Sequence, residues 1–307
     1  MADAEQLRGR LANIRTVQPV LRALRTISLG SWQAALNRRG GLQRYVTQLQ
    51  TLIPPTVAAM VERQSPGRSR FFTRPTEPIS DASALEQLTV LAIGTERGLC
   101  GRFNQAVLAE VLACLQKQRE AGVAVNLIVL GSRLARLLSR NGVKPDRTIA
   151  LSTSALPSFS DISVLTRDWL DRYEAYTLDA VDVIFNAYRG LGRYETTTRR
   201  IIPPEIAPVS PTSSSLVDSV LNPYIVETDP WSLYARVIEQ ETMVRCYSLL
   251  LESATAEHST RYQLMEGATQ NAERLQEELT LELQALRRQA ITREMQELAV
   301  GAGLLQR

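Results

Sequence analysis

Hydrophobic positions near the N-terminus follow a helical rhythm. Between residues 4 and 52, apolar side chains recur about every 3.5 residues, the spacing of a coiled-coil seam, and this predicts one long helix. Pro19 lies inside the pattern and is expected to bend the helix, and Ile-Pro-Pro at 53–55 is expected to stop it. Asn-Arg-Arg-Gly-Gly at 37–41 is a second weak point. The stripe consists of Leu7, Leu11, Ile14, Leu21, Leu24, Ser28, Ser31 or Trp32, and Ala35.

A second and longer helical pattern occupies the C-terminal part of the chain. From Asp229 to about Leu304 the only proline in the sequence is Pro230, which suits the first turn of a helix. About 75 residues at ~1.5 Å each would span roughly 110 Å, which is longer than one domain. Such a helix needs a partner for its apolar stripe, and the N-terminal helix is the nearest candidate. The stripe consists of Leu264, Ala268, Ala272, Leu275, Leu279, Leu283, Leu286 and Ala290.

The middle of the chain alternates between strand and helix patterns. Such alternation predicts a mostly parallel sheet covered on both faces. Residues 196–203 are expected to pair with the third strand as an antiparallel edge. The predicted strands lie at 88–93, 123–131 and 181–189, and the predicted helices at 104–119, 132–142 and 161–176.

Together these patterns predict an α/β domain inserted between long N- and C-terminal helices that form an antiparallel coiled coil. Segments rich in Pro, Ser and Gly mark the boundaries. The expected divisions are the N-terminal helix at 1–60, a linker at 61–84, the α/β domain at 85–210, a linker at 211–228 and the C-terminal helix at 229–307.

Composition and charge narrow the class of protein. Of 307 residues, 44% are hydrophobic and 22% charged, as in an ordinary folded protein. No apolar run reaches the roughly 18 residues of a membrane-spanning helix, and the polar N-terminus lacks a signal-peptide core, so we expect a cytosolic protein that could dock onto a membrane complex. Eight arginines within residues 1–44 could bind nucleic acid or anionic lipid. A solvated helix face is favoured over both interpretations, and the lack of interleaved aromatic residues disfavours binding of single-stranded nucleic acid in particular.

Few side chains offer catalytic or metal chemistry. Three widely spaced cysteines form no CxxC pair, so neither a zinc site nor a disulfide framework is expected. His258 is the only histidine, and a surface position is expected for it. Most Ser/His and Cys/His arrangements are therefore disfavoured. We expect no cofactor, no metal and no catalytic residue.

The stretch Gly-Thr-Glu-Arg-Gly-Leu-Cys-Gly-Arg-Phe-Asn at 94–104 connects a predicted strand to a helix. A glycine-rich turn of this kind can present N–H groups to phosphate. However, it matches neither GxxxxGK[ST] nor GxGxxG, so nucleotide binding there is disfavoured. Arg97 and Arg102 would favour a Cys100 thiolate, but no general base accompanies it, and a buried apolar role is expected.

We therefore interpret this stretch as a structural corner in which Gly98 and Gly101 allow the turn. The residues of this turn motif are Glu96, Arg97, Gly98, Leu99, Cys100 and Gly101.

Three motifs carry a resemblance to a known family. Thr-Glu-Arg-Gly-Leu-Cys-Gly-Arg-Phe-Asn resembles S-D-R-G-L-C-G-x-x-N. Residues 261–272 resemble R-M-x-A-M-x-x-A-T-x-N-A, and residues 287–305 resemble R-Q-A-x-I-T-x-E-I-x-E-I-x-x-G-A-x-A-L. With these motifs the whole chain resembles the gamma subunit of F-type ATP synthases, the central rotor stalk.

The resemblance implies a function and a set of partners. The paired helices would pass through the hexamer of alpha and beta subunits, while the α/β domain would sit on the epsilon subunit and the membrane c-ring. The chain would couple proton or sodium flow to ATP synthesis or hydrolysis at beta-subunit sites, with no active site of its own. It would be a peripheral membrane protein on the cytoplasmic face of a bacterial plasma membrane, or of a thylakoid membrane.

The same resemblance implies a contact with the hexamer. In a gapless register Arg287 matches a family arginine, while Arg288 replaces a glutamine and Gln289 an alanine. In the family this pair meets a carboxylate-bearing loop of the beta subunit, and two arginines would still suit carboxylates. The residues expected at this contact are Arg25, Arg261, Arg287, Arg288, Gln289, Thr292 and Glu294.

Departures from the family pattern point to a divergent paralogue in an alternative rotary ATPase. Thr26 replaces a methionine, Ser31 a lysine and Glu96 an aspartate. The regulatory cysteine pair of chloroplast and cyanobacterial chains has no counterpart here. The alternative function is a gamma-like coiled-coil scaffold or regulatory protein outside a working rotary ATPase.

Overall fold

The computed structural model describes residues 2–62, 85–152, 156–204 and 226–301. These residues fall into two compact units. Unit 1 combines Met1–Leu29 with Arg261–Arg307, and unit 2 comprises Gly30–Thr260. Helices α1 (Ala2–Glu62) and α6 (Pro230–Gly301) each contribute to both units. The predicted linkers at 61–84 and 211–228 lie almost wholly outside the described residues, so those boundaries stay predictions.

Unit 2 contains a five-stranded sheet in the order β3-β2-β1-β4-β5. The first four strands of that order run parallel, and β5 runs antiparallel to β4, which confirms the predicted mostly parallel sheet. Among the described strands only β3 was not predicted, because three residues are too few to show a pattern. The strands are β1 (Gln87–Ile93), β2 (Ala124–Leu130), β3 (Arg147–Ile149), β4 (Ala180–Gly190) and β5 (Arg193–Ile202).

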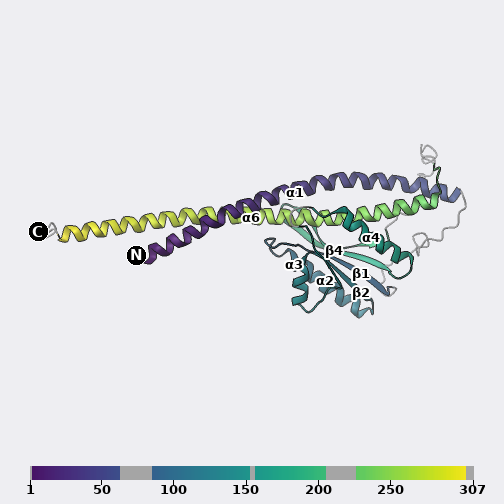
Figure 1. Cartoon of the computed structure of the whole chain (residues 1–307), viewed down its shortest axis with the longest axis horizontal. Coiled ribbons are helices and arrows are strands. Elements are labelled where there is room, and N and C mark those ends of the chain that lie inside the picture. Colours follow the sequence, from purple (N-terminus) through teal and green to yellow (C-terminus); the bar gives the residue numbers. More distant parts are fainter. Residues whose placement is uncertain (1, 63–84, 153–155, 205–225, 302–307) are drawn as a thin grey trace. The chain divides into compact units, whose positions relative to one another are not determined.

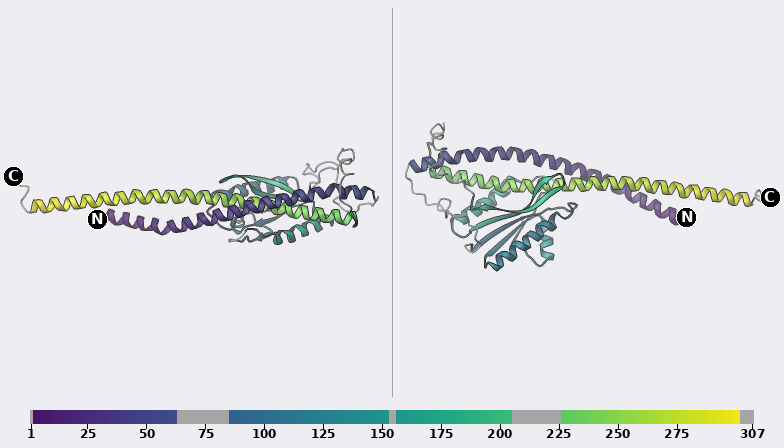
Figure 2. Two further views of the ribbon diagram at one scale, coloured as in Figure 1. Left: turned by 90° about the horizontal axis from the view of Figure 1, so that it is seen from above. Right: turned by 180° about the vertical axis from the view of Figure 1, so that it is seen from behind.

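Helices cover both faces of this sheet, as Figure 1 and Figure 2 show. α2 (Phe103–Glu120) and α3 (Ser132–Arg140) lie on one face, and α4 (Phe159–Glu174) lies on the other with the first part of α6. Side chains of each strand point alternately to the two layers, so a strand buried on both faces reads as a continuous apolar run. In β1, Leu88, Val90 and Ala92 pack against α2 and α3, whereas Leu91 and Ile93 pack on the opposite layer.

Helix α1 continues past the prolines at which the sequence predicts a stop. The expected stop at Ile-Pro-Pro was wrong, because the helix continues through Pro54 and Pro55 to Glu62. Each proline removes only one N–H group from the helical ladder, and burial of neighbouring side chains offsets that loss. Ile53, Val57 and Met60 of α1 pack against Trp231, Tyr234 and Ile238 of α6, and Met60 is 4% exposed.

Unit 1 is a pair of antiparallel helix segments, which confirms the predicted pairing of the two helical ends. Leu7 and Leu11 of α1 pack against Leu283 and Leu279 of α6, and all four are buried. Farther along, Arg22 forms an ion pair with Glu273 at 2.8 Å, and Arg25 pairs with Glu266 at 2.9 Å. Residue numbers therefore rise along one segment while they fall along the other. Among the described helices, none is both long and apolar enough to cross a membrane.

Candidate functional sites on the helix pair and at the glycine-rich corner

The corner between β1 and α2 depends on two residues in the left-handed backbone region. Gly101 has φ 60°, as the expected role of a glycine requires, and Leu99 has φ 64°. For a leucine this conformation is strained, because the β-carbon crowds the following carbonyl group. Gly98 does not take a left-handed conformation, so the turn is made by Leu99 and Gly101 rather than by Gly98 and Gly101.

A hydrogen-bonded pair closes the corner. Asn104 accepts the backbone N–H of Thr95 with its Oδ1 at 3.0 Å and donates its amide to Thr95 Oγ1 at 2.8 Å. Thr95 Oγ1 in turn donates to the carbonyl of Arg97 at 2.7 Å. Both Thr95 and Asn104 are buried, so these bonds satisfy polar groups that water cannot reach.

Cys100 is a packing residue. It is 2% exposed and lies in an apolar cluster with Phe103 and with Ala256 of α6, which confirms the expected buried thiol. The corner thus attaches the sheet to the long helix within unit 2.

Two further residues of α6 are also buried to different degrees. Burial raises the pKa of the Cys246 thiol to about 12. His258, for which a surface position was expected, is half-buried on α6.

Glu96 connects the corner to two segments outside its own loop. Its Oε2 accepts the backbone N–H of Ser132 at 3.0 Å and that of Leu151 at 3.2 Å. Ser132 is the first residue of α3, which begins after Gly131 without a side-chain cap, so Glu96 supplies the capping carboxylate from another segment. Burial favours the neutral acid, but hydrogen bonds from Ser132 and Leu151 outweigh it and lower the pKa of Glu96.

The residues expected at a hexamer contact lie in two settings. Arg25 is tied to Glu266, and Arg261 is 8% exposed. The other five are exposed along the last described turns of α6, where Thr292 Oγ1 also donates to the carbonyl of Arg288 at 2.9 Å. These five are Arg287, Arg288, Gln289, Thr292 and Glu294.

A groove between the two segments of unit 1 was not visible in the sequence. It has a volume of about 540 Å³, an apolar floor of Leu11 and Leu283, and arginines at Arg8, Arg15 and Arg287. Three guanidinium groups above an apolar floor suit a segment that carries carboxylates beside apolar side chains. The sequence predicted a contact for Arg287 but not the groove, because the position of the groove depends on the register between the two helices.

Beyond this groove α6 presents an apolar face. Within the described residues, the apolar cluster shared with α1 reaches only to Leu286. Ile291, Met295 and Leu298 follow at helical spacing, and their exposed fractions are 60%, 65% and 65%. An exposed stripe of this kind marks a surface that a partner covers.

Comparison with known proteins identifies relatives along the whole chain. The model of a family described as "ATP synthase" matches residues 3–305. An "ATP synthase gamma chain" of Parabacteroides distasonis is 22% identical over 304 residues, covering 99% of each chain. One of Helicobacter pylori is 23% identical over 307 residues, covering 99% of this chain and 100% of that protein.

Solved structures share the fold. The central stalk and c-ring structure of the Tetrahymena thermophila mitochondrial ATP synthase contains a similar chain, with a TM-score of 0.54 and 18% identity over 81% of this chain and 99% of that one. The rotor of the Euglena gracilis mitochondrial ATP synthase contains another, with a TM-score of 0.56 and 13% identity over 94% of this chain and 99% of that one.

Proposed function

Because the chain belongs to the gamma-chain family of the ATP synthases, we propose that it is the central rotor shaft of a rotary ATP synthase. The observation that carries this proposal is the family match over residues 3–305, which includes both long helices and the sheet between them. The shaft couples proton or sodium flow through a membrane ring to ATP synthesis or hydrolysis on other subunits. Its own residues perform no chemistry.

The exposed face of α6 supports this role. Ile291, Met295 and Leu298 form an apolar stripe. Such a stripe is suited to contact apolar side chains that a partner arranges in a circle around the helix. Hydrophobic contact is non-directional, so a stripe can move from one ring position to the next without breaking hydrogen bonds. A rotating shaft needs a bearing surface with this property.

The groove of unit 1 supports a second contact. Arg8, Arg15 and Arg287 offer fixed positive charge, and the planar fork of each arginine binds carboxylates in two-point geometry. We assign to this face a carboxylate-bearing loop of the beta subunit. Arg288, Gln289, Thr292 and Glu294 extend the same contact, while Arg25 and Arg261 contribute from the paired part of the helices.

The partners of the shaft follow from this assignment. The alpha and beta subunits form the surrounding hexamer, and the α/β unit sits on the epsilon subunit and the membrane c-ring. The chain is then a peripheral component of a membrane-associated ATP synthase on the cytoplasmic face of a bacterial plasma membrane, or of a thylakoid membrane.

Reconstitution tests the proposed function. The full chain is mixed with the alpha and beta subunits of the same genome, and assembly and MgATP hydrolysis are measured. We expect a stable complex that hydrolyses ATP, and no hydrolysis by the chain alone. A chain that enters no complex with these subunits is instead a gamma-like scaffold, and the rotor proposal is then wrong.

The contact residues are tested separately in membranes that hold the whole enzyme. Changing Arg287 and Arg288 together to Ala should lower coupled ATP synthesis while assembly persists, because the charges that face the carboxylates are lost. Arg274→Ala is the control, since Arg274 is exposed on α6 and, among the described residues, pairs with Glu278 of the same helix. Equal synthesis in the double variant and the control would refute the assigned contact without affecting the rotor role.

A further inference from the structure

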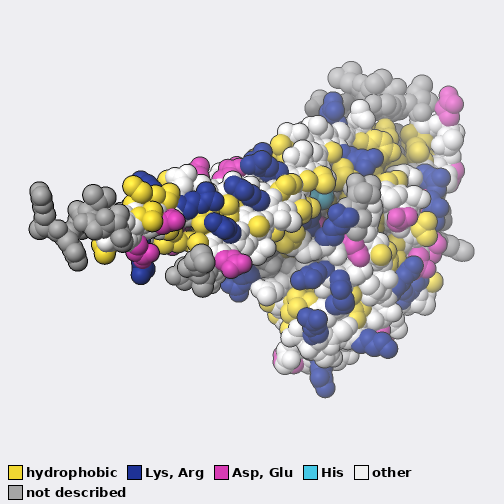
Figure 3. All heavy atoms as spheres, turned by 60° about the vertical axis from the view of Figure 1, so that its left-hand side comes forward, with side chains coloured by type: hydrophobic (Ala, Val, Ile, Leu, Met, Phe, Trp, Pro, Cys, Tyr) yellow, Lys and Arg dark blue, Asp and Glu magenta, His cyan; other side chains and the backbone are white. Residues whose placement is uncertain are grey.

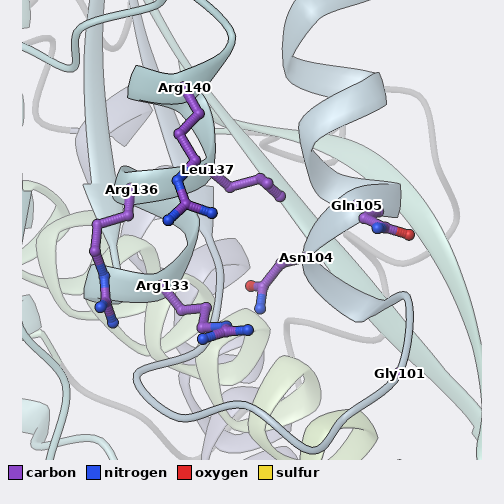
Figure 4. Close-up of a pocket in the computed structure, with 7 residues that line it drawn as sticks. All are labelled: Gly101, Asn104, Gln105, Arg133, Arg136, Leu137 and Arg140. Carbon is purple, nitrogen blue, oxygen red and sulfur yellow. The ribbon is translucent and has the colours of Figure 1, made fainter.

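A small pocket opens in unit 2 between α3 and the first turn of α2 (Figure 4). Its volume is about 140 Å³. A single water needs only about 10–15 Å³ on the same kind of measure, so the pocket has room for a tetrahedral oxyanion with part of its hydration shell. The pocket is lined by Gly101, Asn104, Gln105, Arg133, Arg136, Leu137 and Arg140.

Three arginines give this pocket its charge. Arg133, Arg136 and Arg140 lie on one side of α3, spaced so that neighbours are one helical turn apart. All three are exposed, and among the described residues none of them forms an ion pair, whereas Arg167 and Arg200 elsewhere in unit 2 do. Figure 3 shows Lys and Arg side chains crowded on this part of the molecule.

The carboxylate that interacts with this cluster already accepts hydrogen bonds from elsewhere. Glu96 interacts electrostatically with Arg136, but its Oε2 accepts the N–H groups of Ser132 and Leu151. Within the described residues, no acidic side chain lines the pocket itself. The like charges on α3 therefore repel one another, and no ion pair among the described residues neutralises them.

The side chains are arranged to act together. In Figure 4, Arg133 points across the pocket toward Asn104, and Arg140 reaches down toward the same space from the next turns of α3, while Gln105 points away. Arg136 lies alongside, and its Nε donates to the carbonyl of Ser132 at 3.2 Å. That bond uses one of the five N–H groups of a guanidinium and does not involve the two terminal nitrogens.

We propose that this pocket binds a tetrahedral oxyanion of the phosphate type, either inorganic phosphate or the phosphate group of a nucleotide. Guanidinium forks match phosphate oxygens in charge and geometry. The pocket also adjoins the segments that follow β1 and β2, and ligands of open α/β sheets bind outside the carboxyl ends of the strands. Among the described residues no aromatic side chain lines the pocket, so it offers no stacking surface for a base and would recognise the phosphate alone.

The site is independent of the rotor role, and the full purified chain is sufficient to test it. Inorganic phosphate is titrated into the chain at constant ionic strength set with chloride, and binding is followed by calorimetry and by 31P line broadening. A second arm uses ADP, and a third uses adenosine. We expect saturable binding of phosphate and of ADP but not of adenosine. If ADP binds more tightly than phosphate and still requires the arginines, a nucleotide is the source of the phosphate group.

Variants distinguish the pocket from general positive charge. The triple variant R133Q/R136Q/R140Q should weaken phosphate binding about tenfold or more, because several charge-assisted hydrogen bonds are lost. The control R119Q/R193Q/R199Q removes the same charge from exposed arginines outside the pocket and should bind as the unchanged chain does. Circular dichroism confirms that both variants are folded. The proposal is overturned if phosphate and ADP do not saturate at tens of millimolar, or if both triple variants weaken binding equally.

Discussion

The capping role of Glu96 leads to a prediction that separates charge from hydrogen bonding. Glu96→Ala removes the acceptor of two N–H groups, those of Ser132 and Leu151. Glu96→Gln keeps a side-chain oxygen in the same place but removes the negative charge. Glu86→Gln is the matched control, because Glu86 is exposed and its side chain makes no described contact with α3.

The magnitudes follow from the geometry. Loss of a helix cap costs about 0.5–2 kcal/mol, and loss of a hydrogen bond to a charged acceptor costs about 1.5 kcal/mol. Ser132 and Leu151 are only partly buried, so water replaces part of what is lost. We expect Glu96→Ala to lower the free energy of unfolding by about 2 kcal/mol. Glu96→Gln should cost about 0.5 kcal/mol, the value of one charge at a helix N-terminus.

Urea titration followed by tryptophan fluorescence measures these changes. All three tryptophans, Trp32, Trp169 and Trp231, lie in unit 2, so the signal reports the unit that contains Glu96. The pKa of Glu96 is lower in the folded chain than its ordinary value of 4.5. The stabilisation by its charge is therefore complete above pH 4.5 and disappears as the pH falls through the folded pKa.

Two results would refute this reasoning about Glu96. One is an equal free energy of unfolding for Glu96→Ala, Glu86→Gln and the unchanged chain at neutral pH. The other is a difference between the unchanged chain and Glu96→Gln that grows, rather than shrinks, in acid. Either result would mean that the carboxylate does not cap α3 in solution.

Three further predictions concern packing, an ion pair and the thiols. Gly94→Ala should lower the free energy of unfolding by about 3 kcal/mol or abolish soluble expression, because the added β-carbon would overlap the side chain of Leu134 in α3. A urea midpoint equal to that of the unchanged chain would contradict this. Asp182→Asn should cost about 2 kcal/mol, because Arg200 donates two hydrogen bonds to this buried carboxylate at 2.8 and 3.0 Å. A double-mutant cycle with Arg200→Gln should return a coupling of similar size. Burial raises the pKa of both Cys114 and Cys246, so a thiol reagent at pH 8 should modify Cys114 slowly and Cys246 only on unfolding; rapid modification of Cys246 in the native chain would count against its burial.

The sequence predicts the layout of the sheet because burial on both faces leaves a direct signature. The strands around Leu91, Ile128 and Val183 read as apolar runs, and these residues are indeed neighbours in the central register. The end of α1 could not be predicted, because Pro54 and Pro55 are locally unfavourable and only packing against α6 overrides them. A local conformational preference is overridden wherever burial in a long-range contact offsets the free energy that the unfavourable residues cost.

The candidate sites likewise include features that the sequence could predict and features that it could not. Burial of Cys100 could be inferred, because no general base accompanies it in the sequence. The partners of Glu96 lie 36 and 55 residues away, and no local pattern reports such a distance. The groove of Arg8, Arg15 and Arg287 depends on helix register, and the arginine pocket depends on how α3 packs beside α2. Both arise only from tertiary structure.

The division into units has a consequence for biosynthesis. Met1–Leu29 is made first, but its partner within unit 1 begins only at Arg261, after the whole of Gly30–Thr260. At about 5–20 residues per second, the apolar stripe around Leu7 and Leu11 waits roughly ten to fifty seconds on the ribosome for Leu279 and Leu283. Unit 2 can begin to fold during that interval, whereas unit 1 can form only near the end of translation. The nascent N-terminal helix is therefore the segment for which a chaperone matters most.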